Sequence, residues 1–319
     1  MVKWSTDRPK PERGASKDGG RSGLGPLGIF DRLFGAAEQA GPEDKRRVEA
    51  VTLAVAGGKG GTGKSFFATN LAVLLHQQGR SVTLVDCDFG LACDHLLLGV
   101  SPKMTLQHLV MGRARVRDIR IPTPAGPSLV PGASGVRTMT DLSDHELLAL
   151  GTGLGELAGI EDIVILDVGA GITPQNVLTI LCADHTILVT EAEIAALTGA
   201  YAVVKEVGKL RADVDLSVVV NRVIKPGHGD KTYEKLRTNA GRYTGINLGY
   251  LGEIMLDPTV TQRRLGQLPL SVIDPQGATT AAIRKIVGRL ETTLGSFEPR
   301  RVEPSGTFEQ RFRGHRLFI

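Results

Sequence analysis

The feature that most constrains the fold is a glycine-rich loop between an apolar run and a helical pattern. Gly58 to Ser65 reads GKGGTGKS and matches G-x-x-x-x-G-K-[ST]. The loop follows the run VTLAVA and opens the segment KSFFATNLAVLLHQ. Glycines let the backbone turn so tightly that several N–H groups can point at one phosphate, at a helix N-terminus that favours anions. The loop therefore predicts a nucleotide-phosphate site beyond the end of a strand.

Short apolar runs alternate with helical patterns over residues 48–294. We expect strands at residues 51–56, 81–86, 128–131, 162–167, 185–190, 216–221 and 248–252. Helices are expected at residues 64–78, 144–158, 174–183, 195–210, 230–242 and 279–294. Continuous apolar runs such as IVIL and SVVVN are typical of parallel strands covered on both faces. The expected fold is α/β, a doubly wound and mostly parallel sheet flanked by helices, in a single P-loop domain with flexible tails.

Both ends of the chain differ in composition from this domain. Residues 1–47 are predicted to be a disordered basic tail with a short amphipathic helix at about residues 27–40. That helix could dock on the domain, on a membrane surface or on a partner. Residues 295–319 are predicted to be a flexible basic and apolar tail, in which Gly314 interrupts any continuous helix. This tail could contact anionic lipid, the domain or a partner.

Composition excludes several classes of protein. The chain has three cysteines, too few for a disulfide framework, and no pair has the C-x-x-C spacing of a metal or redox site. No signal peptide and no uncharged apolar run of about 18 residues are evident. We therefore expect a cytoplasmic protein whose membrane contact, if any, is peripheral at the inner face. The net charge of +4 permits anionic partners without demonstrating one.

Oxygen and nitrogen groups at strand ends suit a magnesium nucleotide. Lys64 can supply a mobile charge to the β- and γ-phosphates, and the Ser65 hydroxyl can coordinate Mg²⁺. Asp86 and Asp88 follow one predicted strand and Asp167 ends another, at the edge where open α/β sheets bind ligands. The alternative, a helix-cap or turn role, is credible for Asp86 taken alone but is a weak explanation of the two carboxylates together. The predicted cofactors are ATP and Mg²⁺, and the predicted metal ligands are Ser65, Asp86 and Asp167.

A second lysine, Lys59, lies inside the loop. Like-charge repulsion disfavours another cation beside Lys64 in one phosphate cradle. Lys59 is therefore expected to point away from its own site and toward a partner.

At these residues the chain resembles the MinD/ParA family of deviant Walker A ATPases, whose loop reads KGGxGK[ST]. The string DCDFGLA is similar to that family's switch I, and DVGAGI is similar to its Walker B and switch II in the form found in FlhG/FleN flagellar-number regulators. The resemblance implies that Lys59 reaches across a homodimer and that Asp88 positions the attacking water. It also implies that Asn221 contacts adenine, for which an amide offers a donor and an acceptor.

The predicted site follows from these arguments together. The predicted catalytic residues are Lys59, Lys64 and Asp88. The predicted nucleotide-binding residues are Gly58, Lys59, Gly60, Gly61, Thr62, Gly63, Lys64, Ser65, Phe66, Gly171, Asn221 and Arg222.

The chain departs from the family pattern in three places. Cys93 stands where switch I usually has Asn. The family usually has an Asp close to the position of His95, and Asp94, one residue away, could substitute for it. The segment TEAEIAA keeps only Glu193 of a TPEPTA-like string. The N-terminus shows no DQAxxLR-like motif, so contact with a flagellar partner GTPase is unsupported.

The resemblance implies a MinD/FlhG-like spatial regulator. ATP would close a homodimer, an anionic membrane surface or a protein partner would recognise it, and slow hydrolysis, stimulated by a protein partner, would reopen it. The alternative is a ParA-like DNA or cargo-partitioning ATPase that binds duplex DNA non-specifically. An iron–sulfur carrier of this fold would need paired cysteines, and a tyrosine kinase a tyrosine-rich tail, and the sequence shows neither.

Overall fold

The computed structural model of the chain describes residues 47–133, 142–262 and 267–316. The expected N-terminal tail and its helix at about residues 27–40 lie outside these ranges, apart from the last residue of the tail. Within these ranges, no helix has both the length and the apolar composition that crossing a bilayer requires.

An eight-stranded sheet forms the centre of the fold, in the order β4-β5-β3-β6-β2-β7-β8-β9. Neighbouring strands are parallel, except that β4 and β5 are antiparallel. The strands are β2 (Val51–Gly57), β3 (Val82–Cys87), β4 (Ile121–Pro122), β5 (Ser128–Val130), β6 (Ile163–Ala170), β7 (His185–Thr190), β8 (Leu216–Val223) and β9 (Leu248–Met255). The predicted doubly wound, mostly parallel α/β sheet is confirmed.

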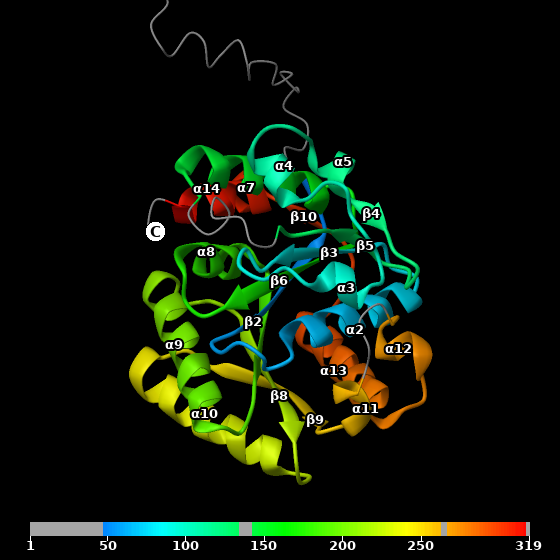
Figure 1. Cartoon of the computed structure of the whole chain (residues 1–319). Coiled ribbons are helices and arrows are strands. Elements are labelled where there is room, and N and C mark those ends of the chain that lie inside the picture. The colour runs from blue at the N-terminus through cyan, green and yellow to red at the C-terminus, as the bar shows by residue number, and fades with distance from the viewer. Residues whose placement is uncertain (1–46, 134–141, 263–266, 317–319) are drawn as a thin grey trace, which may run out of the picture. The chain divides into compact units, whose positions relative to one another are not determined.

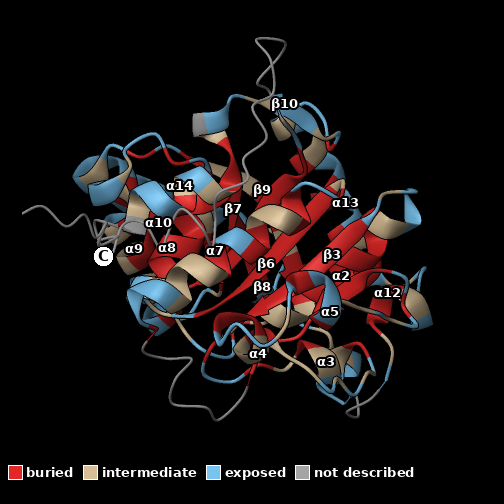
Figure 2. Cartoon of the chain, turned by 90° about the horizontal axis from the view of Figure 1, so that it is seen from above, coloured by how far each residue is buried: buried red, intermediate tan, exposed pale blue. Residues whose placement is uncertain are grey.

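Helices cover both faces of this sheet (Figure 1). One face packs on α2 (Lys64–Gln77), α12 (Leu270–Ile273) and α13 (Ala278–Leu294). The other packs on α4 (Leu106–Val110), α5 (Val116–Ile119), α7 (Asp144–Ala158), α8 (Pro174–Cys182), α9 (Ile194–Leu210), α10 (His228–Thr244) and α14 (Phe308–Arg316). Buried residues follow the sheet and the inward sides of the helices, as Figure 2 shows.

The longer elements fall where the sequence pattern predicts them, with ends that differ by up to three residues. Several short elements have no counterpart in the prediction, because a few residues are too short to display a period. They are β1 (Arg47–Glu49), β4, β10 (Arg300–Val302), α3 (Asp94–Leu97), α4, α5, α11 (Pro258–Thr261), α12, α14 and a 3₁₀ turn at Pro304–Gly306.

The C-terminal segment differs from the flexible tail that its composition predicts. Residue 308 begins α14, which packs on α7 and α8 and continues through Gly314 to residue 316. The rings of Phe308 and Phe312 are each 1% exposed. Of the three expected contacts, the structure shows the one with the domain, because the two rings complete its hydrophobic core.

An ionic contact fixes the same segment. The carboxylate of Asp184, whose side chain is 4% exposed, meets the guanidinium groups of Arg300 and Arg311. It also accepts hydrogen bonds from the backbone N–H of Thr52 at 2.8 Å and the hydroxyl of Thr52 at 2.7 Å. Burial alone would raise the pKa of Asp184, but the two arginines and Thr52 outweigh it and hold the pKa below its ordinary value. A buried carboxylate with two cationic partners therefore joins α14 and β10 to the start of β2.

Candidate functional site

The glycine-rich loop runs from the end of β2 to the first residue of α2. Gly63 is the residue before the helix and has a left-handed backbone with φ 88°. A Cβ at Gly58 would stand 1.9 Å from the carbonyl group of Gly199 in α9. Glycine is thus required at position 63 by backbone conformation and at position 58 by the close approach of α9.

The structure brings Asp86 and Asp167 together with the start of α2. The two carboxylates are aligned on neighbouring parallel strands, β3 and β6, and both are buried. Burial and the charge of Asp86 raise the pKa of Asp167, which the Ser65 hydroxyl and the Lys64 ammonium only partly offset. Hydroxyl and carboxylate oxygens are the ligands that Mg²⁺ prefers, so this group of side chains fits the predicted metal.

A third carboxylate, Asp94, completes an acid cluster with Asp86 and Asp167. Ligand oxygens of the three lie within 4.8 Å of one another. Burial, followed by the charge of Asp167, raises the pKa of Asp94 well above its ordinary range. The sequence analysis considered Asp94 only as a substitute for a switch I residue and missed it as a member of this cluster. The available signal is that Asp86 and Asp94 lie on either side of one short turn, where two carboxylates can share a site.

Asp86 and Asp88 both also hold the turn after β3. Asp86 accepts hydrogen bonds from the backbone N–H of Asp88 at 3.2 Å and of Asp94 at 3.0 Å. Asp88 accepts them from Gly90 at 3.1 Å and Leu91 at 2.9 Å. Both carboxylates therefore have a turn role, which the sequence favours only for Asp86 taken alone. The reason is that this tight turn leaves several N–H groups without helix or strand partners.

The carboxylate of Asp88 lies beside the last residues of β6. A Cβ built on Gly169 would stand 3.3 Å from Asp88. The same strand end is held by Asn176, a buried residue of α8 whose side-chain amide donates to the carbonyl oxygens of Gly169 at 3.0 Å and Ala170 at 3.2 Å. Asn176 is not among the residues predicted from the sequence, although the amides of Gln175 and Asn176 at the start of the otherwise apolar helix PQNVLTILC are an available signal.

Lys59 points toward α9 rather than toward the acid cluster. Its ammonium forms an ion pair with Glu193 at 2.5 Å, and the two side chains are 39% and 56% exposed. The expected partner of Lys59 is a second subunit, whereas the partner in this structure is a residue of the same chain. The exposure of the pair leaves Lys59 accessible from outside.

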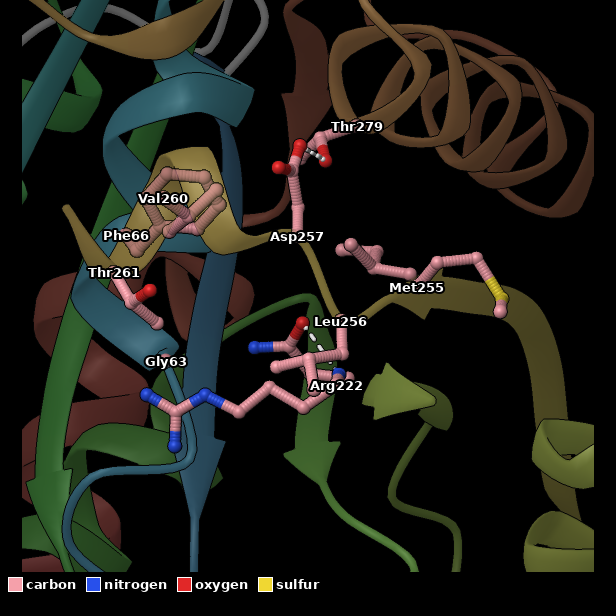
Figure 3. A pocket seen from close by; sticks show the side chains of 11 residues that line it. Gly63, Phe66, Arg222, Met255, Leu256, Asp257, Val260, Thr261 and Thr279 are labelled. Carbon is pink, nitrogen blue, oxygen red and sulfur yellow. Dashed lines mark hydrogen bonds between the residues drawn. The ribbon is translucent and has the colours of Figure 1, made fainter. Parts of the chain in front are cut away.

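A pocket next to the loop brings together four predicted nucleotide-binding residues, Gly63, Phe66, Asn221 and Arg222 (Figure 3). The side-chain amide of Asn221 donates to the Thr62 carbonyl at 2.8 Å, and its oxygen accepts from the backbone N–H of Arg222 at 2.9 Å. Arg222 has a left-handed backbone, with φ 52°, and its guanidinium bonds Glu191 at 2.9 Å. Asn221 therefore ties β8 to the loop besides lining the pocket.

The opposite wall of this pocket comes from segments that the sequence analysis did not assign to the site. Asp257 begins α11 and accepts a 2.6 Å hydrogen bond from the Thr279 hydroxyl, and Figure 3 shows the two side chains facing each other. Val260 and Thr261 complete this wall. These residues are far from the glycine-rich loop in sequence, and no short motif marks them.

The other predicted residues occupy the two loops already described. Gly60, Gly61, Thr62 and Ser65 belong to the loop and the start of α2, and Gly171 follows β6 with φ 91°.

Comparison with known proteins identifies the family. Residues 53–270 match the family described as CobQ/CobB/MinD/ParA nucleotide binding domain. The chain is 31% identical to Antiactivator FleN of Pseudomonas aeruginosa over 240 residues, which cover 75% of this chain and 86% of FleN. It is 30% identical to Flagellum site-determining protein YlxH of Helicobacter pylori over 247 residues, which cover 76% of this chain and 82% of YlxH.

A solved structure supports the same family assignment. The septum site-determining protein MinD complexed with Mg-ADP from Pyrococcus horikoshii superposes with a TM-score of 0.61 at 26% identity, covering 77% of this chain and 97% of that protein. These similarities confirm the resemblance to the MinD/ParA family, on the side of the flagellar regulators. The chain belongs to the family of CobQ/CobB/MinD/ParA nucleotide binding domains.

Proposed function

We propose that the chain binds ATP with Mg²⁺ at this site and acts as a dimerisation switch that slow hydrolysis resets. In this proposal the loop amides and Lys64 bind the phosphates, and Ser65, Asp86 and Asp167 hold Mg²⁺. Asp88 positions the water, Asn221 and Arg222 contact the base, and Lys59 completes the site of a second subunit. The described arrangement of the loop, the carboxylates and the base pocket supports these roles.

The observation that supports the proposed dimer is a rim of exposed apolar side chains around the site. Leu91, Ile172 and Ile194 are 77%, 46% and 83% exposed. They follow β3, β6 and β7 respectively, so they lie at the same edge of the parallel sheet as the glycine-rich loop. Large apolar residues clustered at one edge mark an interaction surface. A second copy of the chain that closed over the nucleotide would cover this rim.

The relatives suggest what such a switch would control. FleN is named an antiactivator, YlxH a flagellum site-determining protein and MinD a septum site-determining protein. We propose that this chain is likewise a spatial regulator, acting at a cell pole, a flagellar site or a division site. It would work in the cytoplasm, peripherally at the inner face of the membrane, with a protein partner that stimulates hydrolysis.

One experiment separates this proposal from a ParA-like partitioning role. The full chain is sedimented with anionic liposomes or with duplex DNA, in ATP and in ADP, over a range of salt concentrations. A spatial regulator that acts at the membrane is expected to sediment with liposomes in the presence of ATP. Sedimentation with DNA alone, falling steeply with salt, would instead favour the partitioning role.

Lys59→Ala is expected to keep ATP binding and to lose ATP-dependent dimerisation. The reason is that Lys59 is half-exposed on the outer side of the loop and bound to Glu193 rather than to the acid cluster. Light scattering with ATP and Mg²⁺ measures the dimer, and titration with a fluorescent ATP analogue measures binding. Lys205→Ala, at an exposed lysine of α9, is the control. A normal dimer of the Lys59 variant would remove the proposed role across the interface.

Asp88→Ala is expected to keep the dimer and to lower the rate of ATP hydrolysis by about 10²-fold, the usual size of a proton-transfer or water-positioning contribution. Asp88→Asn serves as the control for folding, because its amide oxygen can still accept the turn hydrogen bonds from Gly90 and Leu91. Phosphate release measures turnover for both variants. If both dimerised and hydrolysed ATP at the normal rate, Asp88 would not position the water.

A further inference from the structure

We propose that Asp94 makes the acid cluster a three-carboxylate site that binds one divalent cation in the absence of nucleotide. The inference goes beyond the proposed switch, in which Mg²⁺ arrives with ATP. It concerns a residue at which the chain departs from the family pattern, and it rests on geometry and burial.

The geometry matches a cation site. Asp86, Asp94 and Asp167 each offer an oxygen within 4.8 Å of the others, a spacing that a central ion bound to all three can bridge. Asp86 and Asp167 lie on the neighbouring strands β3 and β6, and Asp94 begins α3, so three separate elements meet at the site. Carboxylates from different elements converge here without a matching number of basic residues.

The burial of the cluster points to a missing ligand. Asp94 is 0% exposed, and neither of its side-chain oxygens has a hydrogen-bond partner among the described residues. Within the same part of the chain, Oδ1 of Asp167 also has none. Buried carboxylates are ordinarily paired, hydrogen-bonded or bound to metal, because removing them from water is otherwise costly. Lys64 lies near Asp167 and supplies one positive charge against three acids.

The backbone holds Asp94 in place before any ligand binds. Its N–H donates to Asp86 at 3.0 Å, and its carbonyl accepts from the N–H of Leu98 at 2.9 Å. Leu98 is completely buried in the core and anchors α3. The backbone of Asp94 is therefore fixed beside Asp86, with its side chain completely buried. Fixed oxygen ligands of this kind suit a small hard cation such as Mg²⁺ or Mn²⁺.

Mn²⁺ is the probe for the test. The nucleotide-free full chain is titrated with Mn²⁺, and the electron paramagnetic resonance signal of the free ion measures binding. The expected result is one Mn²⁺ per chain, with binding at least about tenfold weaker in Asp94→Asn, since even outer-shell changes weaken metal sites by roughly 10–100-fold. The isosteric amide keeps the side-chain volume and removes the charge.

Glu161→Gln is the matched control. Glu161 is also buried, but it already pairs with Arg120 at 2.6 Å and accepts from Thr83 at 2.9 Å, beyond the opposite ends of the strands. Its replacement is expected to leave Mn²⁺ binding unchanged. A Mn²⁺-dependent rise in melting temperature that is present in wild type and absent in Asp94→Asn gives a second readout and reports whether the variant is folded.

The outcomes separate this inference from the proposed function. Wild type that binds Mn²⁺ only when ATP is present would overturn the three-carboxylate site and leave the switch intact. Equal Mn²⁺ binding by wild type and Asp94→Asn would remove Asp94 from the site. Failure to bind ATP, alongside normal Mn²⁺ binding without nucleotide, would overturn the switch alone. Because the wild-type titration requires no variant, the inference is testable even if Asp94→Asn fails to fold.

Discussion

Lys64→Ala is expected to weaken ATP binding by roughly 30-fold or more and thereby to abolish ATP-dependent dimerisation. Lys64 is 7% exposed at the first turn of α2. The positive charge of its ammonium lowers the pKa of the buried Asp167 and so partly offsets the effect of burial. In the proposed complex it is the buried positive charge nearest both the phosphates and the acid cluster. Truncating one partner of a buried charge pair costs about 2–5 kcal/mol, so ATP affinity should fall by roughly 30-fold or more. Isothermal titration with ATP and Mg²⁺ measures the loss.

The comparison with Lys59→Ala makes this prediction specific. Both changes remove a lysine from the same loop, but only Lys64 is buried beside the carboxylates. The Lys64 variant should bind ATP roughly 30-fold more weakly or worse, whereas the Lys59 variant should bind it normally as a monomer. Two variants with the same defect, or a Lys64 variant that binds ATP normally, would contradict the division of roles between the lysines.

Phe312→Ala is expected to destabilise the domain by about 3–5 kcal/mol, the usual cost of deleting a buried aromatic ring. The ring is 1% exposed and lies 6.1 Å from the ring of Phe308, centre to centre. A Cβ on Gly151 of α7 would stand only 2.5 Å from it, so the ring packs directly on that helix. For a domain of this size the melting temperature should fall by roughly 10 °C. Thermal unfolding followed by circular dichroism measures the change.

Phe312→Leu and a shortened chain provide the controls. Leucine keeps much of the buried volume, so its cost should be clearly smaller, on the order of 1 kcal/mol. Removing residues 308–319 should destabilise the domain at least as much as the alanine change. A chain without these residues that melts like wild type would show that the segment behaves as the flexible tail that its composition predicts.

Two separations in sequence explain why the C-terminal segment could not be predicted. Arg311 and its partner Asp184 are separated by 127 residues. The N–H of Phe308 donates to Glu49, which lies 259 residues earlier. Local periodicity reports only on one element at a time. The composition of this segment is therefore typical of disorder when it is considered alone. The residues that hold it in place are distant in the chain, so no local pattern reveals them.

The acid cluster also contains both residues that the sequence predicts and one that it does not. Asp86 and Asp167 were predicted to share one edge, because both end apolar runs of parallel strands and those ends meet in any sheet of this class. Asp94 enters the cluster only because the turn after Asp86 folds back and buries it. The sequence shows the acid but not the direction of the turn.

The sequence by itself determined the α/β class, the position of nearly every long strand and helix, and the phosphate-binding loop with its lysines and strand-end carboxylates. These features are local, because a hydrophobic period and a glycine-rich turn each lie within about 20 residues. The tertiary structure alone decided the pairing of Lys59 with Glu193, the wall of the pocket around Asp257, the third carboxylate and the docking of α14. Each of these depends on which distant segments the packed core brings into contact, and no local pattern encodes that.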